Sequence, residues 1–299
     1  MYKFAFIVLH YMNVSDTIEC VDSIIRTISG KNYDIIVVDN GSNNGSYEVL
    51  KERYLRHSFV HILRSQENIG FARGNNIGFK YAKHRLGSDF IILLNNDTIL
   101  LQPNFLEKIE EIYRKTEFAV LGPDITTPKG EHQNPQRVKP LTISEAKRLR
   151  MKFFILLTLN FVGLDAFFQR IYRDIKRRLG ISPAKIQNDL YLKELENVQL
   201  HGACLIFSPE YVKRFEGLYD KTFLYVEEDI LFHLCLHEGL KTLYSPEIRI
   251  FHKEDGSTDF IYRTSSRKRR FIYLNTIKSL KVFLNFVRNY ENEVKRIKG

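Results

Sequence analysis

Short, wholly apolar runs that stop abruptly at polar residues recur through the first hundred residues of the chain. They cover Phe4–Leu9, Ile35–Val38 and Phe90–Leu94. Runs this short, rich in strand-forming residues, indicate strands buried on both faces, as in a sheet with helices on either side. Segments with apolar residues at helical spacing lie between or beside them, namely Val14–Ile28, Tyr47–Tyr54 and Asn76–His84. This alternation predicts an α/β domain with a mainly parallel central sheet.

The polar residues that end these runs are predicted to meet at one edge of the sheet, where α/β proteins bind ligands. The third run ends at Asn95-Asn96-Asp97, a carboxylate flanked by two amides, which is suited to holding a divalent cation against a phosphate. The second run ends at Asp39-Asn40-Gly41-Ser42. These residues can accept hydrogen bonds from a nucleobase or ribose, or they can form a plain turn.

Two glycines, an arginine and three asparagines crowd the segment from Glu67 to Asn76. Small-residue loops that lead into a helix favour anions, and Arg73 adds a positive charge for a pyrophosphate. The segment has no Gly-Lys-Ser/Thr ending, so it is not a P-loop. The alternative is a capped loop that binds no ligand.

Three successive carboxylates, Glu227-Glu228-Asp229, precede apolar residues at helical spacing. They can simply stabilise the amino terminus of that helix. Alternatively, one of them is a general base, because mutual repulsion and partial burial raise a carboxyl pKa. His201-Gly202 opens a further strand-like segment and His252 ends another. His201 can simply be a structural polar residue at a strand edge. His252 is either structural or a metal ligand.

Seven motifs in order resemble the family 2 inverting glycosyltransferases with a GT-A fold, especially rhamnosyltransferase-like enzymes of bacterial polysaccharide assembly. They are IVLHYMN, IIVVDNGSNN, ENIGFARGNNIG, FIILLNNDT, HGACLIFSPE, FLYVEEDI and IFHKEDGST, and they span most of residues 1–260. The resemblance implies transfer of a sugar from a nucleotide-diphospho-sugar, a UDP-sugar or dTDP-rhamnose, to a hydroxyl of a glycan or lipid-linked acceptor. It also implies a GT-A-type α/β fold.

On the donor side, the resemblance implies that Asp39 contacts the base or ribose of the nucleotide. Asn95-Asn96-Asp97 occupies the place of the family's Asp-x-Asp motif, so Asp97 would hold Mg2+ or Mn2+ on the diphosphate, and His252 would complete the metal site. The remaining nucleotide-sugar contacts would come from His10, Asn13, Asn68, Gly70, Arg73, Asn76, Asn95 and Asn96. The asparagine at 95 removes one negative charge, so metal affinity could be low without substrate.

On the acceptor side, the resemblance implies contacts from His201 and Gly202. Glu227-Glu228 stands where the family usually has Glu-Asp, which makes Glu228 the best candidate base. The extra acid, Asp229, leaves the assignment open, so Glu227 and Asp229 remain alternatives. The base would deprotonate the acceptor hydroxyl for in-line attack, which inverts the anomeric carbon in one step.

The net charge of the 299-residue chain is +10, and the basic residues cluster in Lys139–Arg178 and Arg263–Lys281. Such clusters indicate an anionic partner. The apolar run Phe153–Phe168 lies within the first cluster but is too short and interrupted for a membrane span of about 20 residues. A helix lying on an anionic membrane is predicted, with a solvated basic face as the alternative. No nucleic-acid motif accompanies the charge.

The predicted organisation is a GT-A domain over residues 1–260, a basic helical insertion at 131–197 and an amphipathic helical tail at 261–299. Insertion and tail are expected to form one platform against the inner face of the plasma membrane. The chain has no signal-peptide pattern. A cytoplasmic, peripheral protein is therefore expected, with three reduced core thiols at Cys20, Cys204 and Cys235.

Two other functions fit parts of the pattern. A sugar-nucleotide pyrophosphorylase would also use an α/β nucleotide domain and a metal. Such enzymes usually carry a glycine-rich basic loop after the first strand, where this chain has His10-Tyr11-Met12-Asn13. A scaffold that has lost activity is supported by Asn95. The residues that argue against it are Asp97, Glu227, Glu228 and His252.

Overall fold

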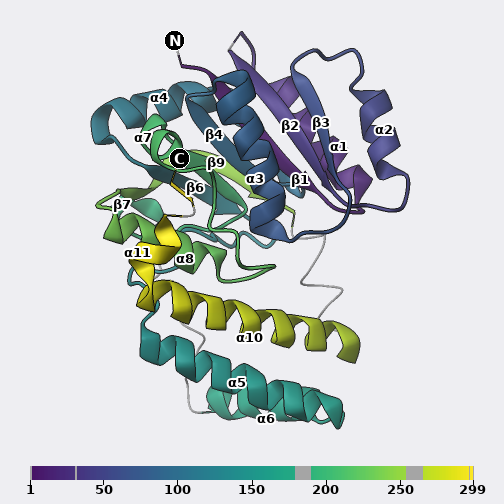
Figure 1. Cartoon of the computed structure of the whole chain (residues 1–299), viewed down its shortest axis with the longest axis vertical. Helices are drawn as coiled ribbons and strands as arrows, with labels where there is room; N and C mark the ends of the chain where they lie inside the picture. The colour runs from purple at the N-terminus through teal and green to yellow at the C-terminus, as the bar shows by residue number, and fades with distance from the viewer. Residues whose placement is uncertain (1, 31, 179–189, 254–264, 296, 299) are drawn as a thin grey trace.

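The computed structural model describes residues 2–30, 32–178, 190–253, 265–295 and 297–298 (Figure 1). The motif residues Glu254-Asp255-Gly256-Ser257-Thr258 and the predicted start of the tail at residue 261 lie outside the described residues. The domain boundaries stay a prediction.

One sheet forms the centre of the molecule, with strand order β3-β2-β1-β4-β8-β6-β9-β5 and β7 paired to β9. Its strands are β1 (Phe4–His10), β2 (Tyr33–Asn40), β3 (Val60–Ser65), β4 (Phe90–Asn95), β5 (Thr98–Ile99), β6 (Val120–Thr126), β7 (Leu195–Glu196), β8 (Cys204–Phe207) and β9 (Thr242–His252). The long pairs, β1–β2, β1–β4, β2–β3 and β6–β9, are parallel. The predicted α/β class with a mainly parallel sheet is confirmed.

Alternate residues of the buried strands pack against different helix layers, because successive strand side chains point to opposite faces. Phe4, Phe6 and Val8 join a core with α1 (Val14–Thr27), α2 (Ser46–Arg53) and α4 (Phe105–Thr116). Ala5 and Ile7 join the opposite core, which includes residues of α3 (Phe71–Tyr81), α7 (Pro209–Arg214), α8 (Glu227–His237) and α10 (Ser266–Arg288). The continuous apolar runs therefore reflect burial on both faces of the sheet.

Helix α3 begins at Phe71, five residues before the segment predicted from apolar spacing, and continues into a π-helix at Ala82–Leu86. Gly70 precedes it with φ of 91°, a conformation that favours glycine. A β-carbon at residue 70 would lie 2.4 Å from the carbonyl oxygen of Phe223. Glycine thus lets the start of α3 pack closely against the segment that leads into α8.

Helices α5 (Ile143–Phe161), α6 (Asp165–Arg178) and α10 lie together beside the sheet-bearing part, with α11 (Tyr290–Val294) after α10 (Figure 1). Thr142 and Glu145 form a capping box that starts α5. Asp165, fully buried, accepts hydrogen bonds from Nε and Nη2 of Arg269 at 2.6 and 3.0 Å. Helices α5 and α6 of the predicted insertion are therefore held against α10 of the predicted tail. Among the helices of the described residues, none has the length and apolar character needed to cross a membrane.

Candidate active site

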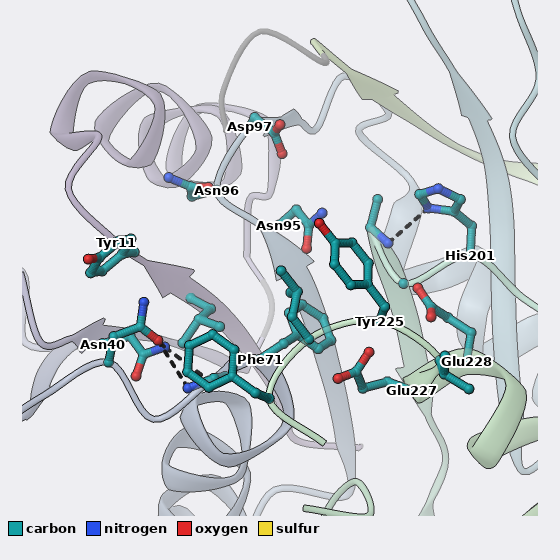
Figure 2. Close-up of a pocket in the computed structure, with 18 of the residues that line it drawn as sticks. Tyr11, Asn40, Phe71, Asn95, Asn96, Asp97, His201, Tyr225, Glu227 and Glu228 are labelled. Atoms are coloured by element: carbon teal, nitrogen blue, oxygen red, sulfur yellow. Dashed lines mark hydrogen bonds between the residues drawn. The ribbon is translucent and has the colours of Figure 1, made fainter. Parts of the chain in front are cut away.

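A pocket of about 440 Å³ opens at the carboxyl ends of β1, β2 and β4 (Figure 2). Its other walls are the residues before β8, the segment before α8 and one residue of α10. The lining residues are Leu9, Tyr11, Asn40, Asn68, Gly70, Phe71, Asn95, Asn96, Asp97, Gln136, His201, Gly202, Ala203, Phe223, Leu224, Tyr225, Val226, Glu227, Glu228 and Phe271. The pocket therefore lies at the carboxyl ends of the strands, the edge at which α/β proteins bind ligands.

Nine of the residues singled out from the sequence line this pocket. They are Asn68, Gly70, Asn95, Asn96, Asp97, His201, Gly202, Glu227 and Glu228. Figure 2 shows Asn96 and Asp97, which follow β4, at the top of the view and the carboxylates of Glu227 and Glu228 lower in it, with Asn95 and Tyr225 between them. The candidate metal ligand and the candidate bases thus face one another across a single cavity.

His10 and Asn13 do not line the pocket, and their hydrogen bonds are internal. The ring nitrogens of His10 each lie 2.7 Å from a hydroxyl, that of Thr17 for Nδ1 and that of Ser46 for Nε2. Burial lowers the pKa of His10. Oδ1 of Asn13 accepts from the backbone N–H of Asp16 at 3.3 Å and caps α1. These two residues hold helices against β1 in this structure.

Arg73 and Asn76 also lie outside the pocket lining. Nε of Arg73 donates to the carbonyl of Asp220 at 2.9 Å. The amide of Asn76 donates to the carbonyl of Leu218 and accepts from its N–H, both at 2.7 Å. Both side chains therefore fasten α3 to the segment that precedes α8, and their predicted nucleotide contacts stay predictions.

Asp39 is fully buried just below the pocket. Its Oδ1 accepts from the backbone N–H of Ser42 at 3.0 Å. Its Oδ2 has no hydrogen-bond partner among the described residues and lies 3.5 Å from Nε of Arg64. A buried carboxylate oxygen without a donor is costly unless something supplies one. Arg64 partly compensates this oxygen, Asp39 does not line the pocket, and its predicted contact with the nucleotide stays a prediction.

Asn40, named from the sequence as a possible acceptor of hydrogen bonds from a nucleobase or ribose, lines the pocket and braces the segment that forms its floor. Its Nδ2 donates to Oδ1 of Asn68 at 3.1 Å and to the carbonyl of Gly70 at 3.2 Å. Its Oδ1 accepts from the N–H of Ile69 at 3.1 Å. The position of Asn68 in the pocket is therefore fixed by the end of β2.

Asp97 lines the pocket and His252 lies behind it, outside the lining, with Oδ1 of Asp97 3.1 Å from Nε2 of His252. Nδ1 of His252 lies 2.7 Å from Oε1 of Gln133, and both Asp97 and His252 are buried. A carboxylate suits Mg2+ or Mn2+ when phosphate oxygens and water complete the shell, whereas an imidazole is a softer ligand that fits Mn2+ better than Mg2+. In the parts of the chain that the structure describes, no group of three or more His, Cys, Asp or Glu side chains could hold a metal.

His201 is oriented by its own backbone and its neighbours. Its Nδ1 lies 3.1 Å from the N–H of Ala203, which donates to it, and its own N–H donates to Oδ1 of Asn134 at 2.7 Å. Burial, together with His252 at a ring separation of 5.9 Å, lowers the pKa of His201 to about 4. The ring is therefore neutral at pH 7, and Nε2 carries the hydrogen and can donate to a substrate oxygen.

Helix α8 begins directly after two non-glycine residues in the left-handed region, Tyr225 (φ 73°) and Val226 (φ 72°). A β-branched residue in this region is uncommon and strained, and such strain concentrates at functional sites. The turn aims Glu227 and Glu228 into the pocket (Figure 2). It also places Tyr225 across the middle of the cavity.

The three acids differ in their surroundings. Burial, followed by the charge of Glu228, raises the pKa of Glu227 well above its ordinary range. Burial also raises the pKa of Glu228, and a backbone hydrogen bond from Gly202 partly offsets the effect. Burial and then Glu228 raise the pKa of Asp229 to about 7, although Arg137 lies 3.8 Å away and opposes the shift. Asp229 is not among the pocket-lining residues.

Gln136 and Phe271 line the pocket but were not predicted as site residues from the sequence. Gln136 comes from the segment after β6, and Phe271 comes from α10. The rings of Phe223 and Phe271 lie 6.3 Å apart, so α10 contributes directly to the pocket wall.

Comparison with known proteins identifies the family. Residues 6–175, more than half of the chain, match the domain described as Glycosyl transferase family 2. The chain is 21% identical over 222 residues to the low-salt glycan biosynthesis hexosyltransferase Agl10 of Haloferax volcanii, covering 74% of this chain and 58% of that protein. It is 27% identical over 106 residues to glycosyltransferase GlyG of Streptococcus pneumoniae serotype 4, covering 35% of this chain and 33% of that protein.

The crystal structure of S. aureus TarS 1-349 in complex with UDP has the same fold, with a TM-score of 0.51 and 12% identity over 91% of this chain and 65% of that one. The chain thus spans less than two thirds of the length of each of these proteins. The expected GT-A-type fold is confirmed by this likeness, and the chain belongs to glycosyl transferase family 2.

Proposed function

We propose that this chain transfers a sugar from a nucleotide-diphospho-sugar to an acceptor hydroxyl, with inversion at the anomeric carbon. The observation that supports it best is the pairing of Asn95-Asn96-Asp97 with Glu227-Glu228 across one pocket. A site for a metal-bound diphosphate and a site for a base are both needed for such a transfer, on opposite sides of the reacting carbon.

The donor occupies the side of the pocket formed by the strand ends. Enzymes with a GT-A fold generally use a divalent metal. Asp97 and His252 would hold Mg2+ or Mn2+, which supplies charge to stabilise the departing diphosphate. The buried Oδ2 of Asp39 would accept a hydrogen bond from the base or ribose. A UDP-sugar or dTDP-rhamnose is the donor, and the UDP bound to TarS favours uridine.

Glu228 is the base of the proposed reaction. It lines the pocket, and burial raises its pKa toward the range in which a carboxylate accepts a proton effectively near neutral pH. Glu228 takes the proton of the acceptor hydroxyl as that oxygen attacks the anomeric carbon. The nucleoside diphosphate leaves on the opposite face, and Nε2–H of His201 can stabilise charge on an oxygen in the pocket. One displacement inverts the carbon without a sugar bound covalently to the protein.

The acceptor is a glycan or a lipid-linked glycan of cell-surface polysaccharide synthesis. Support comes from the name of the archaeal relative, a hexosyltransferase of glycan biosynthesis. Basic residues on α5 and α10 fit a peripheral position on the inner face of an anionic plasma membrane.

The test is calorimetric titration of the protein with UDP, dTDP, GDP and ADP, each with and without Mn2+. We expect metal-dependent binding of one nucleotide, which Asp97→Ala abolishes. Asp22→Ala is the control, since Asp22 pairs with Arg53 on the protein surface at a distance from the pocket. If the folded wild-type protein binds none of the nucleotides, the donor site is wrong and the scaffold alternative, which Asn95 favours, replaces it.

A further inference from the structure

Helices α5 and α6 present a large apolar surface that the rest of the described chain leaves uncovered. Nine large apolar side chains there are between 38% and 66% exposed. We call them the hairpin face: Met151, Phe154, Ile155, Phe161, Val162, Leu164, Phe167, Phe168 and Ile171. Monomeric soluble proteins rarely expose so many contiguous apolar side chains, and such a patch marks an interaction site.

The hairpin face follows the helical repeat of both helices. On α5, Met151 and Ile155 lie four residues apart, and Leu164, just before α6, precedes Phe168 and Ile171 of α6 at spacings of four and three residues. Residues this far apart stack on one side of a helix. The opposite side of α5 packs on α10, where the rings of Phe153 and Tyr273 lie 6.0 Å apart. Helix α5 therefore keeps one buried side and one exposed apolar side, while α6 exposes its apolar residues over residues 167–171.

The charge around the hairpin face is positive. Lys147 and Arg148 are exposed one turn before Met151 on the same side of α5, and Arg150 and Arg170 are exposed beside the face. Of the acids in the hairpin, Asp165 is fully buried with its oxygens engaged with α10, and Glu145 forms the capping box at the start of α5. Beyond that cap, basic side chains border the apolar surface with no exposed carboxylate among the described residues 146–171.

The hairpin face is held in place by a buried polar cluster. Asp165 accepts from both Arg269 nitrogens, from the hydroxyl of Tyr273 at 3.0 Å and from Nδ2 of Asn160 at 3.0 Å. The guanidinium of Arg270 lies 4.2 Å above the ring of Phe161. The turn between α5 and α6 is therefore fixed to the start of α10, and the apolar side chains are ordered before any partner binds.

We propose that the hairpin face inserts into the surface of an anionic lipid bilayer. An apolar stripe with cations at its border is the arrangement by which interfacial helices bind: the stripe enters the acyl boundary and the cations meet anionic head groups. A protein partner that covered this face would need acidic residues around an apolar centre. The observed combination of charge and exposure fits a lipid surface directly.

The same surface stands next to the pocket. Arg270 packs on Phe161 of the hairpin face, and the following residue, Phe271, lines the pocket. A docked hairpin face would hold the pocket close to the bilayer surface. If the proposed sugar transfer is correct, this arrangement selects an acceptor carried on a membrane lipid. Binding of the face to lipid does not itself depend on that function.

The experiment is vesicle flotation of the full chain with neutral phosphatidylcholine vesicles and with vesicles containing phosphatidylglycerol. We expect binding to the anionic vesicles that weakens as salt is raised. The double variant Phe154→Ser/Phe167→Ser should bind at least about tenfold more weakly. The matched control is Leu55→Ser/Leu101→Ser, which removes side chains that are 76% and 64% exposed elsewhere, and it should bind as the wild type does.

The proposal is overturned if the wild type does not float with anionic vesicles at low salt, or if the control loses as much binding as the double variant. It is also overturned if the double variant turns a dimeric wild type into a monomer by light scattering, since the face would then join two copies. Calorimetric nucleotide binding by the same samples separates the outcomes. Vesicle binding without nucleotide binding would sink only the transferase function.

Discussion

Gly202 lies so close to Glu228 that a β-carbon at residue 202 would come within 2.5 Å of Oε1 of the glutamate. The two residues come from different elements, the segment before β8 and the first turn of α8. Only glycine leaves the carboxylate room to occupy its present place. The backbone of Gly202 also donates a hydrogen bond to Glu228, so this contact positions the proposed base.

Gly202→Ala should therefore lower kcat while leaving the fold and nucleotide binding intact. The added methyl meets the far end of a flexible side chain, so Glu228 moves away rather than the backbone. A displacement of about 1 Å at a reacting group costs on the order of a hundredfold in rate. The measurements are kcat, nucleotide affinity and the melting temperature. Gly239→Ala is the control: an added β-carbon there meets no atom within 4 Å, and the positive φ of residue 239 makes the change cost stability, so it should lower the melting temperature without changing kcat. An unchanged kcat in Gly202→Ala would remove Glu228 from its role.

Replacing each acid by its amide distinguishes the three candidate bases. Glu228→Gln should lower kcat by about 10²- to 10⁴-fold with little change in donor affinity, since general base catalysis contributes that much. Glu227→Gln and Asp229→Asn keep the proposed base and should cost less. The assay is release of nucleoside diphosphate in the presence of acceptor, which also excludes pyrophosphate as the product. A larger loss for Glu227→Gln than for Glu228→Gln would transfer the role to Glu227.

The sequence predicted the strands and part of the pocket for one physical reason. Strands buried on both faces must be apolar throughout, so β1, β2 and β4 are visible as uninterrupted runs, and the point where each run stops marks the ligand edge. Asn95 and Asp97 were found in this way. The acids at the start of α8 were found because a run of carboxylates before an apolar helical pattern is itself unusual.

Sequence alone did not separate structural from ligand-facing polar residues. Asn76 and His10 have side chains suited to a ligand, yet both make their hydrogen bonds within the fold. Gln136 and Phe271 reach the pocket only because tertiary packing brings a loop and a distant helix to its edge. The spacing of apolar residues within one helix or strand does not predict such contacts, because they depend on how separate elements pack.

Asp229 should destabilise the folded protein as pH rises. Its pKa is raised to about 7 in the folded state, first by burial and then by Glu228, from an ordinary value of 3.8. Between about pH 4 and 7 the folded state retains a proton that the unfolded chain loses, so the free energy of unfolding falls across this window. Asp229→Asn removes the titration. The variant and the wild type should differ least near pH 4, and the variant should gain up to roughly 4 kcal/mol by pH 8.

Urea unfolding at pH 4, 6 and 8 measures this difference. The exposed Glu52→Gln is the control, and its stability should follow that of the wild type at each pH. A variant that gains no stability between pH 4 and 8 would show that Asp229 is ionised in the folded protein without cost. The proximity of Arg137, 3.8 Å away, would then be the reason.

Asp165→Asn should loosen the α5–α6 hairpin from α10. Although burial opposes ionisation, hydrogen bonds from Arg269, Asn160 and Tyr273 outweigh it and lower the pKa of Asp165 to about 2. The stabilisation is therefore complete above the ordinary value of 3.8 and is lost as pH falls toward 2. The amide keeps the volume but leaves the mostly buried Arg269 without its counter-ion, a change that costs about 3–5 kcal/mol in buried pairs.

Amide hydrogen exchange of residues 143–171 is the direct readout, and we expect it to be faster in Asp165→Asn than in the wild type at pH 7. Binding to anionic vesicles should also weaken, even though every side chain of the hairpin face is retained, because two mobile helices must be ordered on the lipid. Glu145→Gln is the matched control: Glu145 belongs to the cap of α5 and does not contact α10 through an ion pair in the described structure. Exchange unchanged by Asp165→Asn would mean that apolar packing along α5 and α10 holds the hairpin without the buried ion pair.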